Sequence, residues 1–135
     1  MRATIHSSIR SAAMCWGRIV SPLARLGTVV LAIGLLGLGV GALVLPEWSA
    51  QTYGVPVEQG AWVQATGLRD LVLGLVLLAL LPSPTALRRI LPLVILLPLG
   101  DVAIVLLDGQ PLAATAPHAV GTLAIAILAG LVWRR

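Results

Sequence analysis

The chain has 135 residues, of which 59% are hydrophobic and only 10% are charged, and its net charge is +4. These proportions exclude an ordinary soluble globular domain and predict one domain whose apolar surface faces lipid. The absence of lysine and asparagine and the single cysteine, Cys15, further exclude Schiff-base chemistry on a lysine, N-glycosylation and an internal disulfide.

The first 21 residues contain arginine and serine but no acidic residue. We interpret residues 1–21 as a cytoplasmic tail that precedes a transmembrane domain of residues 22–135. A transit peptide and an over-extended start upstream of Met14 are the alternatives. Cys15, beside Trp16, is expected to be a structural small residue, with palmitoylation as the alternative.

Four apolar stretches have about the 20 residues that a membrane-spanning helix needs. They are Leu23–Leu45, Ala61–Leu81, Ile90–Leu107 and Ala113–Trp133. Pro22 is suited to opening the first helix, and Pro98 predicts a kink in the third, just before Gly100 and Asp101. The sequence therefore predicts an all-α fold, an integral membrane four-helix bundle.

The first stretch contains a G-x-x-x-G pattern at Gly37 and Gly41. Small residues at this spacing let two helix backbones approach closely. We expect this surface to serve packing within the chain, and a homo-oligomer through the same two glycines is the alternative.

Residues 46–60 connect the first two stretches and contain Trp48 and Tyr53, with Trp62 just beyond. Aromatic side chains at such a position are typical of the belt at a membrane surface. The segment is interpreted as an interfacial connector, and a lid over an outward-facing cavity is the alternative.

Eight of the nine arginines lie in the tail, at the start of the first stretch, between the second and third stretches, or after the fourth. The other two loops carry Glu47, Glu58 and Asp108 and no basic residue. By the positive-inside rule both termini are cytoplasmic. The expected location is a bacterial plasma membrane, or alternatively an organelle membrane. This distribution also accounts for the net positive charge, so no nucleic-acid partner is expected. The expected partner is the lipid bilayer.

Four ionisable residues interrupt the apolar stretches: Arg69 and Asp70 in the second, Asp101 in the third and His118 in the fourth. A charged side chain near the centre of a membrane helix costs about 2.5–3.5 kcal/mol, so these groups need partners. From a rise of about 1.5 Å per residue, all four lie within about 7–14 Å of the outer ends of their helices. They are therefore predicted to meet at one site in the outer half of the membrane.

We expect Arg69 to pair with Asp101 rather than with Asp70, because adjacent helix residues point about 100° apart. Asp70 is expected to meet His118 or a neighbouring threonine or glutamine. The predicted ligand-binding set is Arg69, Asp70, Asp101, His118, Thr66 and Gln64.

The charges of this site do not balance, since one arginine and two aspartates sum to −1 when all are ionised. Because burial disfavours an uncompensated charge, we expect one proton to be shared, either on His118 or on one carboxyl group. The sequence has no metal-ligand motif, P-loop or dinucleotide fingerprint, so neither a metal nor a cofactor is predicted.

The order Gly67-Leu68-Arg69-Asp70 with Gly74, then Gly100-Asp101, then His118 with Gly121, resembles the small membrane proteins grouped as domain of unknown function 4267. The resemblance covers about residues 24–133, and Gly-x-Arg-Asp is its specific part. It implies a four-helix integral membrane protein and brings no established activity.

Three interpretations of function stay open. The first is a module that binds a small apolar or amphipathic molecule in an outward-facing pocket. The second is a small membrane enzyme, because the Asp/Arg/Asp set resembles that of limonene-epoxide-hydrolase-like enzymes. In that case Arg69 would orient Asp70 and Asp101, which would divide the acid and base roles in epoxide opening. The third is a structural or assembly subunit whose polar cluster only fixes helix packing.

Overall fold

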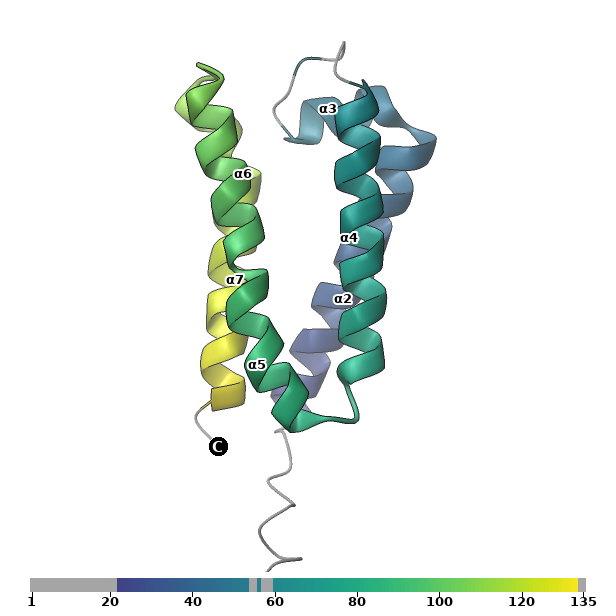
Figure 1. Cartoon of the computed structure of the whole chain (residues 1–135), viewed down its shortest axis with the longest axis vertical. Coiled ribbons are helices and arrows are strands. Elements are labelled where there is room, and N and C mark those ends of the chain that lie inside the picture. Colours follow the sequence, from purple (N-terminus) through teal and green to yellow (C-terminus); the bar gives the residue numbers. More distant parts are fainter. Residues whose placement is uncertain (1–21, 54–55, 57–59, 134–135) are drawn as a thin grey trace, which may run out of the picture.

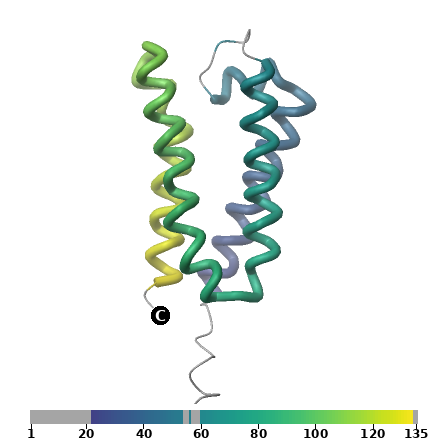
Figure 2. The backbone as a smooth tube through the Cα atoms, in the orientation of Figure 1, coloured from purple at the N-terminus to yellow at the C-terminus, as the bar shows by residue number. Residues whose placement is uncertain are grey.

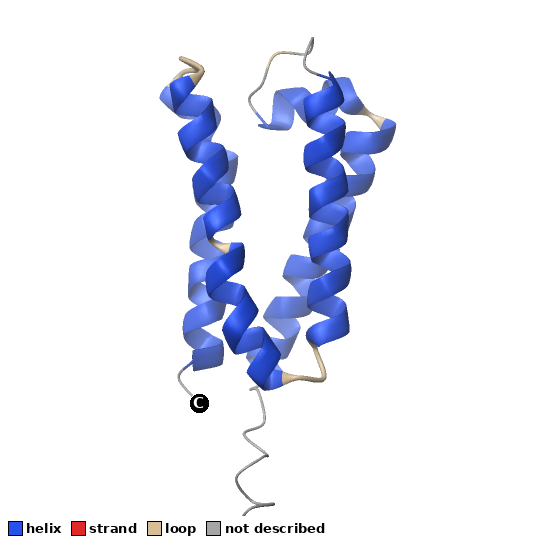
Figure 3. Ribbon diagram, viewed as in Figure 1, coloured by secondary structure: helices blue, strands red, loops and turns tan. Residues whose placement is uncertain are grey.

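The computed structural model describes residues 22–53, 56 and 60–133, and most of these described residues are helical, with no strand among them (Figure 3). The elements are α2 (Pro22–Val44), α3 (Pro46–Tyr53), α4 (Gly60–Leu80), α5 (Pro84–Val94), α6 (Leu96–Leu107), η2 (Leu112–Thr115) and α7 (Ala116–Trp133). The all-α prediction is confirmed. The tail of residues 1–21, with Met14 and Cys15, lies outside the described residues.

Four helical segments are long and apolar enough to cross a membrane: Pro22–Val44, Gly60–Leu80, Pro84–Leu107 and Leu112–Trp133. The bounds of the first two differ by one residue from those predicted. The third segment begins at Pro84 rather than at Ile90, so the predicted loop position of Arg88 and Arg89 is wrong.

Local chemistry explains this early start. The Ser83 hydroxyl caps α5 by accepting a hydrogen bond from the Ala86 backbone N–H at 3.4 Å, and Pro84 follows the cap at the first helical position. Leu87, Leu91 and Val94 then recur on one buried face of α5. Arg88 and Arg89 lie outside this buried face of α5. Because their charges interrupt the apolar pattern, composition alone predicts a loop here.

Arg88 also ties α5 to the end of α7. Its Nε donates a hydrogen bond to the Val132 carbonyl oxygen at 2.9 Å, and Trp133 Nε1 donates to the Arg88 carbonyl oxygen at 3.2 Å. These two bonds join the start of α5 to the last turn of α7.

The predicted kink is present, but it lies at Ile95, between α5 and α6, rather than just before Gly100. Pro98 has no N–H to donate to the Val94 carbonyl, and its ring crowds that carbonyl. The helix is therefore interrupted within one turn before the proline.

The helices α2 and α4 pack closely through glycines. A Cβ atom added to Gly39 would lie 2.6 Å from the Gly67 carbonyl oxygen, and one added to Gly74 would lie 2.9 Å from the Ala32 carbonyl oxygen. Side chains at these positions would force the two backbones apart.

The predicted G-x-x-x-G pair does not make this contact. A Cβ at Gly37 would have no atom within 4 Å, and a Cβ at Gly41 would meet Trp48 and Ser49 of α3 at 3.5 and 3.7 Å. Gly41 therefore packs within the chain, on α3, whereas Gly37 does not, and Gly39, two residues from each, is the glycine that faces α4.

The helices form two groups that lie side by side, α2 with α4 and α5–α6 with α7 (Figures 1 and 2). The short helix α3 lies across one end of the α2–α4 pair, where Ala42, Ala50, Tyr53 and Val63 form a small core. A larger apolar core lies toward the α5 end and includes Leu77, Leu87, Leu91 and Ile125. The space between the two groups contains the site described next.

Candidate functional site

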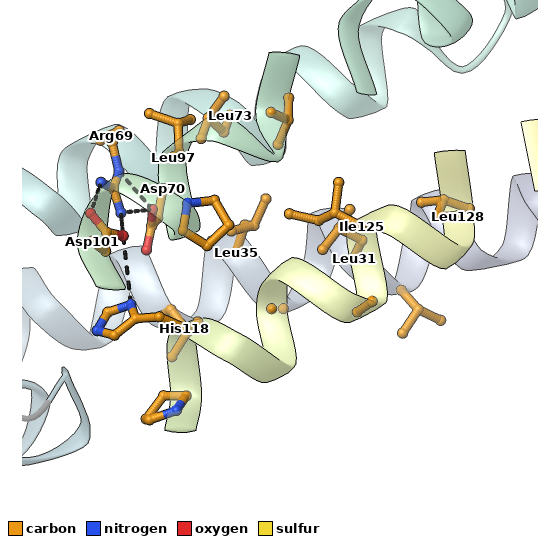
Figure 4. Close-up of a pocket in the computed structure, with 18 of the residues that line it drawn as sticks. Leu31, Leu35, Arg69, Asp70, Leu73, Leu97, Asp101, His118, Ile125 and Leu128 are labelled. Carbon is orange, nitrogen blue, oxygen red and sulfur yellow. Dashed lines mark hydrogen bonds and ion pairs between the residues drawn. The ribbon is translucent and has the colours of Figure 1, made fainter. Parts of the chain in front are cut away.

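Arg69 of α4 lies between two carboxylates (Figure 4). Its Nη1 and Nη2 donate to the two oxygens of Asp101 on α6 at 2.8 and 2.9 Å. Its Nε and Nη2 also donate to one oxygen of Asp70 at 3.2 and 3.1 Å. The predicted Arg69–Asp101 pair is confirmed. The prediction that Arg69 and Asp70 do not pair is wrong, because the long arginine side chain folds back over its neighbour.

His118, near the start of α7, faces Asp101. Its Nδ1 lies 3.6 Å from the second Asp101 oxygen, and its Nε2 lies 3.2 Å from the Tyr53 carbonyl oxygen. Asp70 does not meet His118 as predicted, because its second oxygen accepts a hydrogen bond from the Tyr53 hydroxyl at 3.2 Å. Tyr53 also stacks on His118, with ring centroids 6.2 Å apart.

The side chains of the cluster differ in their exposed fractions. Tyr53, Asp70, Asp101 and His118 are each at most 6% exposed, whereas the Arg69 side chain is 30% exposed. Buried polar groups are stable when each finds a hydrogen-bond partner, as these do. Burial raises the pKa of the Tyr53 hydroxyl above its usual value, and the charge and hydrogen bond of the Asp70 carboxylate raise that pKa further.

The cluster closes one end of a cavity of about 570 Å³ between the two helix groups. The polar lining comes from Thr52, Tyr53, Arg69, Asp70, Asp101 and His118. The rest is apolar and includes Leu31, Leu35, Leu73, Leu97, Ile125 and Leu128 (Figure 4). Of the other two predicted ligand-binding residues, Thr66 is buried and Gln64 is exposed, and neither lines this cavity.

The family model described as Domain of unknown function (DUF4267) matches residues 32–132 of the chain. This chain belongs to the DUF4267 family. The match includes Arg69, Asp70, Asp101 and His118, and it confirms the resemblance noted in the sequence. No curated protein and no solved structure gave a significant match to this DUF4267 chain.

Sequence reasoning missed the role of Tyr53, which it assigned to the aromatic belt. Tyr53 is the last residue of α3, and that short helix brings both its hydroxyl and its carbonyl to the cluster of this DUF4267 protein. One signal was available, since Tyr53 is the single tyrosine of the chain and its connector lies at the same, outer side of the membrane toward which the four ionisable residues are predicted to lie.

The cluster contains groups that can take part in acid–base chemistry and in hydrogen bonding. Two carboxylates share one guanidinium, one also bonds a phenol, and the other faces an imidazole. Among the described residues, no group of three or more His, Cys, Asp or Glu side chains is placed to hold a metal ion.

Proposed function

We propose that this protein spans a membrane four times, has both termini in the cytoplasm and binds a small apolar or amphipathic molecule in the cavity that ends at Arg69. Four segments of sufficient length and apolarity support the membrane part of the proposal. The cavity and its polar end support the binding part.

The distribution of charge supports the orientation. The starts of α2, which contains Arg25, and of α5, which contains Arg88 and Arg89, lie at one end of the molecule (Figure 1). The helix α3, which contains Glu47, and the end of α6, which Asp108 follows, lie at the other end. Arginine-rich ends face the cytoplasm in most multi-pass proteins of the plasma membrane.

Reporter fusions test this orientation in a bacterial host. Green fluorescent protein fused after Arg135 should fluoresce, and alkaline phosphatase at the same position should be inactive, because the phosphatase folds only outside the cytoplasm. Phosphatase inserted in the turn at Gly109 should be active. An active phosphatase after Arg135 would contradict the proposed orientation.

The observation that carries the binding proposal is the cavity itself. The cavity is partly open, since exposed residues such as Val30 and Ile127 line it, and its polar end is largely buried. About 570 Å³ bounded by leucines from several helices is in the range of small-molecule sites. A polar cluster that only fixed helix packing would leave no need for this space.

Two glycines of α2 provide a matched test of binding. Gly34 lines the cavity, and Gly37 lies one turn away and does not, yet a Cβ at either position would meet no atom within 4 Å. Native mass spectrometry of the purified protein should detect a co-purified small molecule. Gly34→Leu should reduce its occupancy several-fold, and Gly37→Leu should retain it. Equal occupancy in both variants, or none in the parent protein, would contradict the proposal.

A second candidate is an acid–base enzyme, favoured by the different partners of the two carboxylates. Asp70 accepts from Tyr53, whereas Asp101 faces His118, and unequal surroundings allow two carboxyl groups to divide acid and base roles. In epoxide opening, one carboxyl group would protonate the epoxide oxygen while the other took a proton from the attacking water, which would give a vicinal diol.

Turnover of a long-chain alkyl epoxide to its diol tests this candidate. Asp101→Asn should reduce the rate by about 10²–10⁴-fold, and Asp108→Asn, at an exposed turn, should leave it unchanged. Absence of diol formation by the parent protein would remove the enzymatic candidate and leave the binding proposal in place.

A further inference from the structure

The cavity is elongated along the helices. Along α7 it extends from His118 to Leu131, a distance of about 20 Å at a rise of about 1.5 Å per residue. A volume of about 570 Å³ along that length is in the range of small-molecule sites. An elongated, mostly apolar cavity of this size suits an extended hydrocarbon chain.

The apolar residues at the opening of the cavity lie several residues from the ends of their helices. Val30 and Ile127 line it and are 62% and 56% exposed. Val30 lies about 12 Å along α2 from Pro22. In a bilayer these positions contact the hydrocarbon region, so the molecules that reach the opening are those dissolved in lipid.

The hydrogen-bond geometry places a proton at the polar end. A carbonyl oxygen only accepts, so His118 Nε2 carries the hydrogen that is donated to Tyr53. The other nitrogen, Nδ1, then faces an Asp101 oxygen at 3.6 Å. A lone pair would repel a carboxylate there, so this contact is favourable only with a proton between Asp101 and His118.

With that proton the charges of the cluster cancel. Arg69 balances Asp70, and the Asp101–His118 pair is neutral as a whole, so the site offers no net charge to an incoming group. A charged head would bring an uncompensated charge into a largely buried site, at considerable cost.

The guanidinium keeps one donor for a ligand. Arg69 has five N–H groups, and its four hydrogen bonds use one on Nε, one on Nη1 and two on Nη2. One Nη1 N–H therefore has no acceptor among the described residues. A ligand head that accepts a hydrogen bond would satisfy this donor.

We infer that the cavity binds a single-chain lipid-like molecule with an uncharged oxygen head, such as an alcohol or a ketone, whose oxygen accepts from Arg69 and whose chain runs along α7 toward Leu131. This inference rests on the proposed binding function and adds the chemical class of the ligand.

Competition between matched probes tests the inference. The full-length protein in phosphatidylcholine vesicles is photolabelled with a diazirine derivative of hexadecanol, and unlabelled hexadecanol, palmitate, hexadecylamine or hexadecane is added as competitor. Hexadecanol should compete at least about tenfold better than the two ionic probes, because they bring an uncompensated charge into the site. It should also compete better than hexadecane, which cannot accept from Arg69. Labelled peptides should come from α2 and α7.

The outcomes separate the claim that the ligand has an uncharged oxygen head from the claim that the cavity binds a ligand at all. Palmitate or hexadecylamine competing as well as hexadecanol would overturn the uncharged head, and equal competition by hexadecane would overturn the role of the free N–H. Labelling that is unaffected by every competitor, or equal in the parent and in Gly34→Leu, would instead overturn the binding function. Gly37→Leu is the control, and its labelling should match the parent's.

Discussion

Arg69 contacts both carboxylates at once because a guanidinium is planar and directs several N–H donors along fixed directions. Two of these donors engage Asp101 and two engage Asp70. Each carboxylate accepts hydrogen bonds from this one guanidinium, so the cluster is expected to respond as a unit when one of its members is changed.

Asp101→Asn tests this dependence. The substitution keeps the size of the side chain but removes the charge that Arg69 and His118 face. Breaking a buried ion pair costs up to about 3–5 kcal/mol, and the retained contact with Asp70 should reduce this loss. Thermal unfolding in detergent should therefore begin at a lower temperature. Asp108→Asn, at the exposed turn, should leave the unfolding temperature unchanged, and equal effects of the two substitutions would contradict the prediction.

Tyr53 provides a pH-dependent signal of its own. Its pKa is raised by burial and by Asp70, so the folded protein holds the phenolic proton more tightly than the unfolded chain does. The stabilising contribution of this protonated phenol is therefore fully present below about pH 10, the pKa of tyrosine in the unfolded chain. It falls as the pH rises beyond that value, because the unfolded chain ionises first.

Ultraviolet titration of the phenolate checks this, since Tyr53 is the single tyrosine. The folded protein should show no phenolate absorption at pH values where the denatured protein is fully ionised. Asp70→Asn should shift the titration toward the usual tyrosine value, and Tyr53→Phe should abolish the signal. Titration of the folded protein at the same pH as the denatured chain would refute the buried contact.

The sequence predicted the Arg69–Asp101 pair because opposite charges at similar depths in different membrane helices have few other partners. It did not predict that Arg69 also contacts Asp70, because helix spacing describes the directions of Cβ atoms and not the reach of a long side chain. It missed Tyr53 because the placement of a residue in a short connecting helix depends on tertiary packing.

At the level of helices, glycine spacing alone did not identify the close contact. Gly37, Gly39 and Gly41 are all compatible with helix packing, and only the rotation of α2 relative to α4 distinguishes them. Hydropathy predicted the bounds of α2 and α4 to within one residue. It placed the start of the third span too late because Arg88 and Arg89 interrupt the apolar pattern, although the capping Ser83-Pro84 pair marks the true start.

A matched pair of alanine substitutions tests the α2–α4 contact. Gly39→Ala places a Cβ 2.6 Å from the Gly67 carbonyl oxygen, whereas Gly37→Ala meets no atom within 4 Å. Overpacking of this kind costs about 1–3 kcal/mol, and an exposed helical alanine in place of glycine gains about 0.5–1 kcal/mol. Gly39→Ala should therefore lower the unfolding temperature and Gly37→Ala should preserve or raise it. The reverse order would show that another face of α2 contacts α4.

Over the whole molecule, the two helix groups are joined in different ways at their two ends. Toward α5 they share the apolar core that includes Leu77, Leu91 and Ile125. Toward α3 they are joined across the cavity by the contact between Arg69 and Asp101. Loss of that contact should let the groups separate at the α3 end while the apolar core holds the other end.

Spin labels across the gap can measure this separation. In a Cys15→Ser background, Leu68→Cys on α4 and Leu99→Cys on α6 place labels at exposed positions near the polar cluster. Electron–electron double resonance in vesicles should give a longer or broader distance distribution when Asp101→Asn is added, because the ionic connection between the groups is lost.

A second pair of labels, at Ala79→Cys on α4 and Leu93→Cys on α5, reports on the opposite end, where both positions are exposed. The apolar core beside them does not depend on charge, so this distance should be unchanged by Asp101→Asn. An equal change at both ends would mean that the polar cluster supports the fold as a whole rather than joining the two groups at one end. No change at either end would mean that packing alone sets the width of the cavity.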